Sequence, residues 1–273
     1  MTIARQGFDL SGKVALVTGG SGILGRHFCE GLAAAGANVA VVDLDTKAVS
    51  VFAAELQARH GCRCIGVACD VADPGAVERM MTEVVAAFGR LDIAHSNAAT
   101  KTDDLAAFFA PLETYSLETW REVMAVNLDG MFLVARAAGC AMAQAGQPGS
   151  IILTSSIYGV VAPDNRIYEG SQYLGRPINT PPVYAASKAG VIGLARYLAA
   201  HWASNGIRVN ALSPGGVESG QNDTFSSRYS SRVPLGRMAQ AKEIVGALLF
   251  LASDASSYVT GQNIVVDGGL TAW

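Results

Sequence analysis

The sequence has little that would tie it to metal, nucleic acid or a membrane surface. It contains five cysteines and four histidines among 273 residues, and an odd cysteine number without a secretory leader argues for reduced thiols. Neither residue type shows zinc-site spacing, so we expect no metal. Lysine and arginine number 20 against 23 acidic residues, giving a formal charge of −3, and they form no basic block. We therefore expect neither nucleic acid nor anionic membrane as a partner.

Signal peptides and long apolar runs are also missing. The first residues, MTIARQGFDLSGK, have no apolar core of the kind that a secretory signal requires. We find no continuous apolar run of the roughly 18 residues that a spanning helix needs. From these features we expect a soluble, cytoplasmic protein.

The rest of the chain alternates between two patterns without a linker or an internal repeat. Short apolar runs predict strands near residues 13–20, 38–45, 64–71, 90–99, 150–156, 207–216 and 261–269. Helical spacing predicts helices near residues 25–36, 47–61, 74–89, 117–146 (with an interruption at Gly130), 183–206 and 241–253. Apolar strands that alternate with helices predict a single-domain α/β fold over residues 1–273. It would be a Rossmann-type, doubly wound parallel sheet with helices on both faces.

A glycine-rich segment follows the first predicted strand. Gly19, Gly22 and Gly25 are three positions apart, a spacing that allows a tight turn and lets backbone N–H groups approach a pyrophosphate at a helix N-terminus. Turn glycines without a ligand are the alternative. The strand before them, the helix after them and the acid that follows favour a dinucleotide site.

That acid is Asp43, at the end of the second predicted strand. A carboxylate at this position can accept hydrogen bonds from a ribose and would repel a 2′-phosphate, so the sequence favours NAD over NADP. A solvated acid at the end of a strand is the alternative. Arg26 and Lys47 are close enough in the sequence to leave NADP open.

Tyr184 and Lys188 are four residues apart in a predicted helix, so they share one face. A tyrosine is a poor base at neutral pH, because its ordinary pKa is about 10. Lowering that pKa by about three units takes about 4 kcal/mol of preferential phenolate stabilisation. A neighbouring ammonium and a positively charged nicotinamide could supply it.

Segments along almost the whole chain resemble the short-chain dehydrogenase/reductase family. They are VTGGSGILG, CDV, SNAA, VNLDG, TSSIYG, YAASK, RVNALSPGGV and TGQNIVVDGG. The resemblance implies that Tyr184 is the general acid/base and that Lys188 binds the nicotinamide ribose and depresses the tyrosine pKa. It further implies that Ser156 holds the substrate oxygen and that Asn127 anchors a proton-relay water. A homotetramer is implied as well.

The predicted cofactor contacts lie after the strands and on the catalytic helix. They are Gly19, Ser21, Gly22, Ile23, Leu24, Gly25, Asp43, Leu44, Asp70, Val71, Asn97, Ala98, Ala99, Tyr184, Lys188, Pro214, Gly215, Gly216, Val217 and Ser219. The sequence departs from the family pattern at two places. Ile23 stands where the family usually has its middle glycine, and SNAA replaces the usual NNAG.

Ser156 and Tyr184 lie 28 positions apart, farther than is usual in the family. The additional segment, about 160–182, contains prolines at 163, 177, 181 and 182, so it cannot form a helix or a central strand. Because both of its ends are fixed beside the reacting carbon, we expect it to border the substrate pocket. A surface or oligomer-contact loop is the alternative.

The polar character of this insert predicts a small, sugar-like substrate. Arg166 and Arg176 are candidates for binding a carboxylate or phosphate. Candidates for hydrogen bonds with substrate hydroxyls are Tyr168, Glu169, Gln172, Tyr173 and Asn179. A second segment, about 216–238, is a candidate lid.

Together these features predict an NAD-dependent oxidoreductase that acts on a secondary alcohol or ketone. One alternative is an NADPH-dependent 3-oxoacyl thioester reductase, which would need a basic docking patch. Another is a non-catalytic NAD-binding regulator, although such proteins usually lack a catalytic residue.

Overall fold

The computed structural model describes residues 7–173 and 175–273, although the side chains of Tyr173 and Arg176 lie outside what it describes. Seven strands form one parallel sheet in the order β3-β2-β1-β4-β5-β8-β9. Their bounds are β1 (Val14–Thr18), β2 (Asn38–Asp43), β3 (Cys64–Ala68), β4 (Ile93–Ser96), β5 (Gly149–Thr154), β8 (Ile207–Pro214) and β9 (Asn263–Val266). The chain order reverses direction between β1 and β4, which creates the crevice where ligands bind in this type of sheet.

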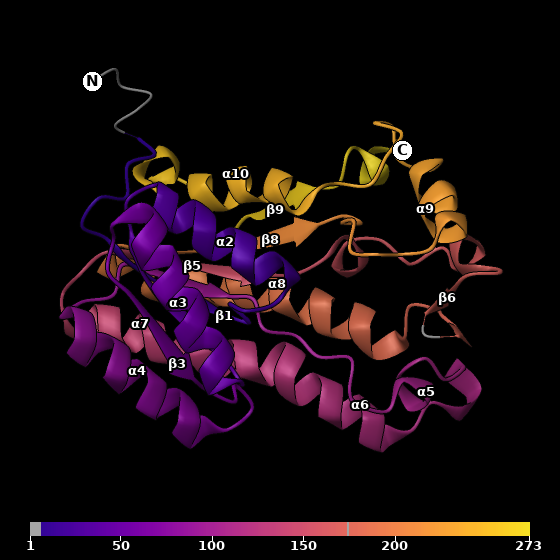
Figure 1. Ribbon diagram of the computed structural model, residues 1–273, viewed down its shortest axis with the longest axis horizontal. Coiled ribbons are helices and arrows are strands. Elements are labelled where there is room, and N and C mark those ends of the chain that lie inside the picture. Colours follow the sequence, from indigo (N-terminus) through magenta and orange to yellow (C-terminus); the bar gives the residue numbers. More distant parts are fainter. Residues whose placement is uncertain (1–6, 174) are drawn as a thin grey trace.

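Helices cover both faces of the sheet, as Figure 1 shows. One face carries α2 (Ile23–Ala34), α3 (Thr46–His60) and α10 (Ala241–Ala252), and the other carries α4 (Pro74–Phe88), α7 (Met131–Gln144) and α8 (Pro182–Trp202). Side chains of β1 alternate between the two cores: Leu16 packs with the α4 side and Val17 with the α2 side. This arrangement confirms the doubly wound α/β prediction.

Capping residues fix where several helices begin and end. Asp45 accepts hydrogen bonds from two backbone N–H groups at the start of α3, and Asp73 caps α4, whose first residue is Pro74. Gly61 and Gly89 end these two helices in the left-handed conformation. Caps of this kind are legible in the sequence, which is why most predicted boundaries lie within a few residues of the observed ones.

The predicted interruption near Gly130 is a change of helix type. α6 (Leu117–Met124) continues into a π-helical turn, Ala125–Gly130, before α7 begins. The helical run Leu117–Gln144 is long and apolar enough to cross a membrane, by length and composition only. Core helices of soluble proteins meet the same criterion, and 44% of the most apolar window of this run is buried within the fold.

The insert has little regular structure, as its prolines predict. It contains a 3-10 turn, Asn165–Tyr168, and a two-stranded antiparallel hairpin of β6 (Gln172–Tyr173) and β7 (Arg176–Pro177), which is separate from the main sheet. The candidate lid contains α9 (Asp223–Ser230), and a short helix that we did not predict, α5 (Leu105–Phe108), follows β4. Figure 1 shows α5, β6 and α9 at the same end of the molecule.

Candidate active site

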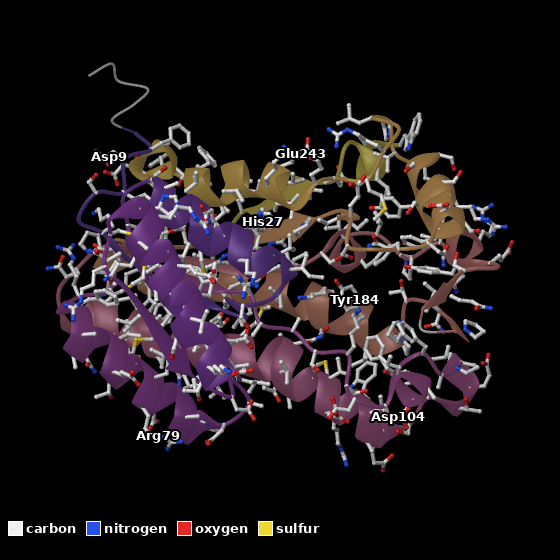
Figure 2. The ribbon with its side chains drawn as sticks, in the orientation of Figure 1. Asp9, His27, Arg79, Asp104, Tyr184 and Glu243 are labelled. Carbon is white, nitrogen blue, oxygen red and sulfur yellow. The ribbon has the colours of Figure 1, made fainter. Side chains whose placement is uncertain are left out.

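A cavity of about 810 Å³ opens where the carboxyl ends of the strands meet these segments. Its lining runs from the glycine loop after β1, past the ends of β2, β3 and β4, to Ser156 and Tyr184 and then to the insert and the candidate lid. One continuous space therefore joins the predicted cofactor end to the predicted reacting end. Figure 2 shows Tyr184 near the middle of the molecule, whereas Arg79 and Asp104 lie at its outline.

The glycine loop is packed too closely to admit side chains. A Cβ on Gly25 would lie 1.9 Å from the carbonyl oxygen of Gly19, and Gly19 itself has φ +64°. Gly22 is the N-cap of α2 and provides no side-chain cap. The first N–H groups of α2 therefore meet the cavity without a capping side chain, and they fit the pyrophosphate of a dinucleotide.

Asp43 is held in place by the same loop. One of its carboxylate oxygens accepts hydrogen bonds from the N–H and hydroxyl of Ser21, at 3.0 and 2.5 Å, and the other accepts the N–H of Leu44 at 2.9 Å. Asp43 and Leu44 line the cavity but Ser21 does not. The Ser21 side chain positions Asp43, and its contact with the cofactor stays a prediction.

The end of β5 is fastened to α8 at Lys188. The Lys188 Nζ donates to the carbonyl of Thr154 at 2.9 Å, and the Ser155 hydroxyl donates to the carbonyl of Lys188 at 2.7 Å. A Cβ on Gly159 would lie 2.6 Å from that same carbonyl oxygen. These contacts explain why two serines and a glycine occur here. Ser155 and Gly159 hold α8 close, and Ser156 is left to line the cavity.

Tyr184 lies one helical turn before Lys188, with the lysine Nζ 5.7 Å from its ring centroid. Burial raises the pKa of Tyr184, and a hydrogen bond with Ser156 acts in the lowering direction. Burial also lowers the pKa of Lys188 to about 8. The Lys188 ammonium donates to the carbonyl of Thr154, and burial keeps the phenol of Tyr184 protonated. The positive charge of a bound nicotinamide would act to lower the tyrosine pKa.

Asn127 lies in the π-helical turn between α6 and α7. Its Oδ1 accepts the N–H of Thr100 at 2.8 Å, whereas its Nδ2 is buried and has no hydrogen-bond partner among the described residues. A buried donor of this kind suits the predicted role of anchoring a water.

Comparisons with known proteins agree with this geometry. The family model described as enoyl-(acyl carrier protein) reductase matches residues 19–271. The chain belongs to the short-chain dehydrogenase/reductase family.

Relatives of the chain include dehydrogenases of sugar alcohols. D-threitol dehydrogenase of Mycolicibacterium smegmatis is 38% identical over 97% of this chain and 95% of its own length. Galactitol 2-dehydrogenase (L-tagatose-forming) of Cereibacter sphaeroides is 37% identical over 98% of this chain and 99% of its own length. The crystal structure of a gluconate 5-dehydrogenase from Burkholderia cenocepacia, in complex with NADP and tartrate, aligns with a TM-score of 0.87 at 34% identity, covering 99% of both chains. The chain is thus an oxidoreductase of this family that acts on alcohols and uses a nicotinamide cofactor.

Most of the predicted cofactor residues come together in the cavity. Those that line it, besides Tyr184, are Gly19, Gly22, Ile23, Leu24, Gly25, Asp43, Leu44, Asp70, Val71, Asn97, Ala98, Ala99, Gly215, Gly216, Val217 and Ser219. Pro214 and Lys188 lie behind this surface, at the end of β8 and beneath β5. Ile23 is at the cavity wall and 61% exposed, so the departure from the family glycine puts a side chain where there is open space.

The predicted substrate residues separate into two groups. Tyr168 and Asn179 line the cavity. Arg166 does not: its side chain is 82% exposed and makes two 2.9 Å hydrogen bonds with the carboxylate of Asp164. In this structure Arg166 is therefore paired with Asp164, and its role in binding a substrate anion stays a prediction. The predictions for the side chains of Tyr173 and Arg176 fall outside the described part of the structure.

Several residues that line the substrate end were missed. They are Thr100, Lys101, Phe108, Phe109, Tyr158, Thr180, Gln221, Phe225, Tyr229 and Met238. Tyr158 could have been found, because it stands two residues after Ser156 inside a motif that we had already identified. The positions in α5 carried no local signal, since only the tertiary fold brings that helix to the cavity. Those in α9 fall within the candidate lid, but no pattern singled out the individual residues.

The buried Lys188 should make stability depend on pH. Its pKa is about 8 in the fold and about 10.4 when unfolded, so the unfolded chain binds more protons between these values and stability rises with pH across that window. The unfolding free energy of wild type minus that of Lys188→Met should therefore increase by about 2 kcal/mol when the pH rises from 7 to 10. Urea unfolding measures this difference. The exposed Lys242 supplies the control Lys242→Met, for which the difference should stay flat; a flat difference for Lys188→Met would contradict the burial argument.

Proposed function

We propose that the protein is an NAD(H)-dependent oxidoreductase that interconverts a secondary alcohol and a ketone on a small, polyhydroxylated, sugar-like substrate. The observation that carries the proposal is the single cavity in which Ser156 and Tyr184 face the same space as the glycine loop and Asp43. Lys188 and Asn127, which lie behind the cavity wall, complete the catalytic set.

A nicotinamide, when bound, supplies the hydride acceptor or donor. Ser156 and Tyr184 share a hydrogen bond and together would hold the reacting oxygen of the substrate. In oxidation the Tyr184 oxygen takes the hydroxyl proton, and in reduction it returns that proton. Burial keeps Tyr184 protonated, so reduction should be favoured near neutral pH and oxidation should become faster as pH rises.

The preference for NAD rests on Asp43. Three hydrogen bonds fix its carboxylate at the cavity wall, where a 2′-phosphate would meet it as a like charge. Arg26, which left NADP open, is engaged by other groups: it donates to the carbonyl of Ser21, and its guanidinium lies 4.3 Å from the ring centroid of Phe52. The related gluconate 5-dehydrogenase structure holds NADP, so the argument for NAD comes from this chain's own residues.

The substrate class follows from the lining of the reacting end and from the relatives. Hydroxyl groups of Ser156, Tyr158, Tyr168 and Thr180 all line that end, and the relatives named above act on threitol and galactitol. A second candidate is an aldonic acid. Lys101 is the only cationic side chain among the described residues that line the cavity, and one structural neighbour is a gluconate 5-dehydrogenase.

The other two functions draw less support. An acyl-carrier reductase would need a basic surface, whereas the arginines nearest the reacting end pair with Asp164 and Glu169. A non-catalytic regulator would not need Ser156, Tyr184, Lys188 and Asn127 together.

The direct test is absorbance at 340 nm with NAD+ or NADP+ and a panel of polyols, aldonic acids and hydroxyacyl thioesters. We expect NAD+-dependent oxidation of polyols, with kcat/KM lower by about 100-fold or more in Tyr184→Phe, the range typical of losing a general acid/base. Activity only with NADP+ and acyl thioesters would overturn the proposal. Preference for an aldonate that is lost in Lys101→Met would support the second candidate.

Cofactor choice should depend on the charge of Asp43. Two unit charges about 4 Å apart repel by about 1 to 4 kcal/mol near a protein surface, so Asp43→Asn should raise the kcat/KM ratio of NADP+ to NAD+ about tenfold or more. Asp45→Asn is the matched control, because Asp45 caps α3 outside the cavity lining and asparagine caps helices equally well. An unchanged ratio in Asp43→Asn would remove the basis for NAD.

A further inference from the structure

Three hydroxyl groups meet at the wall of the cavity opposite the cofactor end. Tyr168, from the insert, donates a hydrogen bond to the hydroxyl of Tyr158 at 3.3 Å, and its oxygen lies 2.5 Å from the hydroxyl of Thr180. All three residues line the same cavity as Tyr184, and Tyr168 is near enough to Tyr184 to influence its pKa. None of the three takes part in the proposed proton transfer.

The insert is held firmly at this place. Ile167, next to Tyr168, is buried in a small apolar cluster with Ile157, Phe225 and Tyr229. The Tyr168 ring lies 5.4 Å from the ring of Phe225 on α9. The hydroxyl cluster therefore stands on a packed support, as a specific binding site requires.

Ionic contacts tie the same two segments together on the outside. Arg232 pairs with Asp164, and Arg228 of α9 donates to the carbonyl of Arg166 at 2.8 Å and lies 3.3 Å from the carboxylate of Glu169. Among the described side chains, Arg166 and Arg232 thus pair with Asp164, and Arg228 pairs with Glu169. Both segments present aromatic rings and hydroxyls to the cavity.

The protons of the three hydroxyls can be counted. Each group has one proton to donate. The contacts of Tyr168 with Tyr158 and with Thr180 use two of these three protons, and either atom can donate in the 2.5 Å contact. Tyr168 is therefore the middle of a chain whose ends are Tyr158 and Thr180, and the chain keeps one O–H that can donate and oxygen lone pairs that can accept.

The two ends of this chain are close together and uncharged. Burial raises the pKa of Tyr158 and of Tyr168, so both stay protonated at neutral pH. Thr180 lies near enough to Tyr158 for a hydrogen bond that acts on the Tyr158 pKa in the lowering direction. A group that donates and accepts at once can satisfy both ends, and an alcohol hydroxyl is such a group. A carboxylate or a thioester carbonyl only accepts.

We propose that Tyr158, Tyr168 and Thr180 form a specificity subsite that binds a second hydroxyl of the substrate, one that does not react. This inference rests on the proposed function and narrows its substrate class to molecules that carry at least two hydroxyls. The insert is then the part of the chain that distinguishes a polyol from a simple secondary alcohol.

The test compares two substrates that differ by one hydroxyl, 2-butanol and 2,3-butanediol, with threitol as a longer polyol. kcat/KM with NAD+ is measured for wild type, Tyr158→Phe, Tyr168→Phe and Thr180→Val. We expect wild type to prefer the diol and each variant to lose that preference by about tenfold, the size expected for a neutral hydrogen bond. kcat/KM for 2-butanol should stay within about twofold of wild type, because a substrate without the second hydroxyl has nothing to lose. Tyr258→Phe is the matched control, since Tyr258 is fully exposed and outside this cavity.

The outcomes separate the inference from the function on which it rests. A wild-type preference for the diol that survives in all three variants overturns the subsite but leaves the proposed function standing. Equal loss of both substrates in the variants overturns the subsite as well, because it would indicate a general structural role. A wild type that acts on 2-butanol as well as on the diol, or on none of the three substrates, overturns the proposed substrate class and the subsite with it.

Discussion

The contact between the end of β5 and α8 is the constraint on which the rest of the site depends. The buried Lys188 ammonium donates to Thr154, and Ser155 donates back to the carbonyl of Lys188. This pair of bonds fixes the rotation of α8, which sets Tyr184 toward Ser156 one turn earlier. It also holds an ammonium in a buried place, where its charge is costly unless a ligand brings compensating contacts. The buried charge of Lys188 therefore lowers the stability of the fold, although the proposed chemistry needs that charge.

The substrate end is built differently from the cofactor end. The glycine loop and Asp43 are held by short-range backbone contacts around the strand ends. The insert and α9 lie outside the main sheet and depend on each other, through the cluster around Ile167 and Phe225 and the ion pairs on its outer side. In such an arrangement the loops determine substrate specificity, while the sheet holds the catalytic and cofactor-binding residues in place.

Sequence patterns predicted the sheet, its covering helices and the cofactor end, because each depends on local signals such as apolar runs, glycine turns and caps. Part of the polar insert, including Tyr168 and Asn179, lines the cavity, and its contact with substrate stays a prediction. Its individual contacts were not predictable. Arg166 looked available for an anion, but Asp164, two residues earlier, captures it. Tyr168 was identified, whereas its partners Tyr158 and Thr180 were not, since only the folded insert brings the three hydroxyls together.

The central claim is that hydride leaves the carbinol carbon directly for a nicotinamide beside Tyr184. The most direct measurement is to oxidise a polyol deuterated at the reacting carbon with NAD+ and to locate the label by mass spectrometry and NMR. The account predicts that the deuterium is found on C4 of the reduced nicotinamide and is not diluted by solvent. Deuterium released into water, with an unlabelled reduced cofactor, would contradict it.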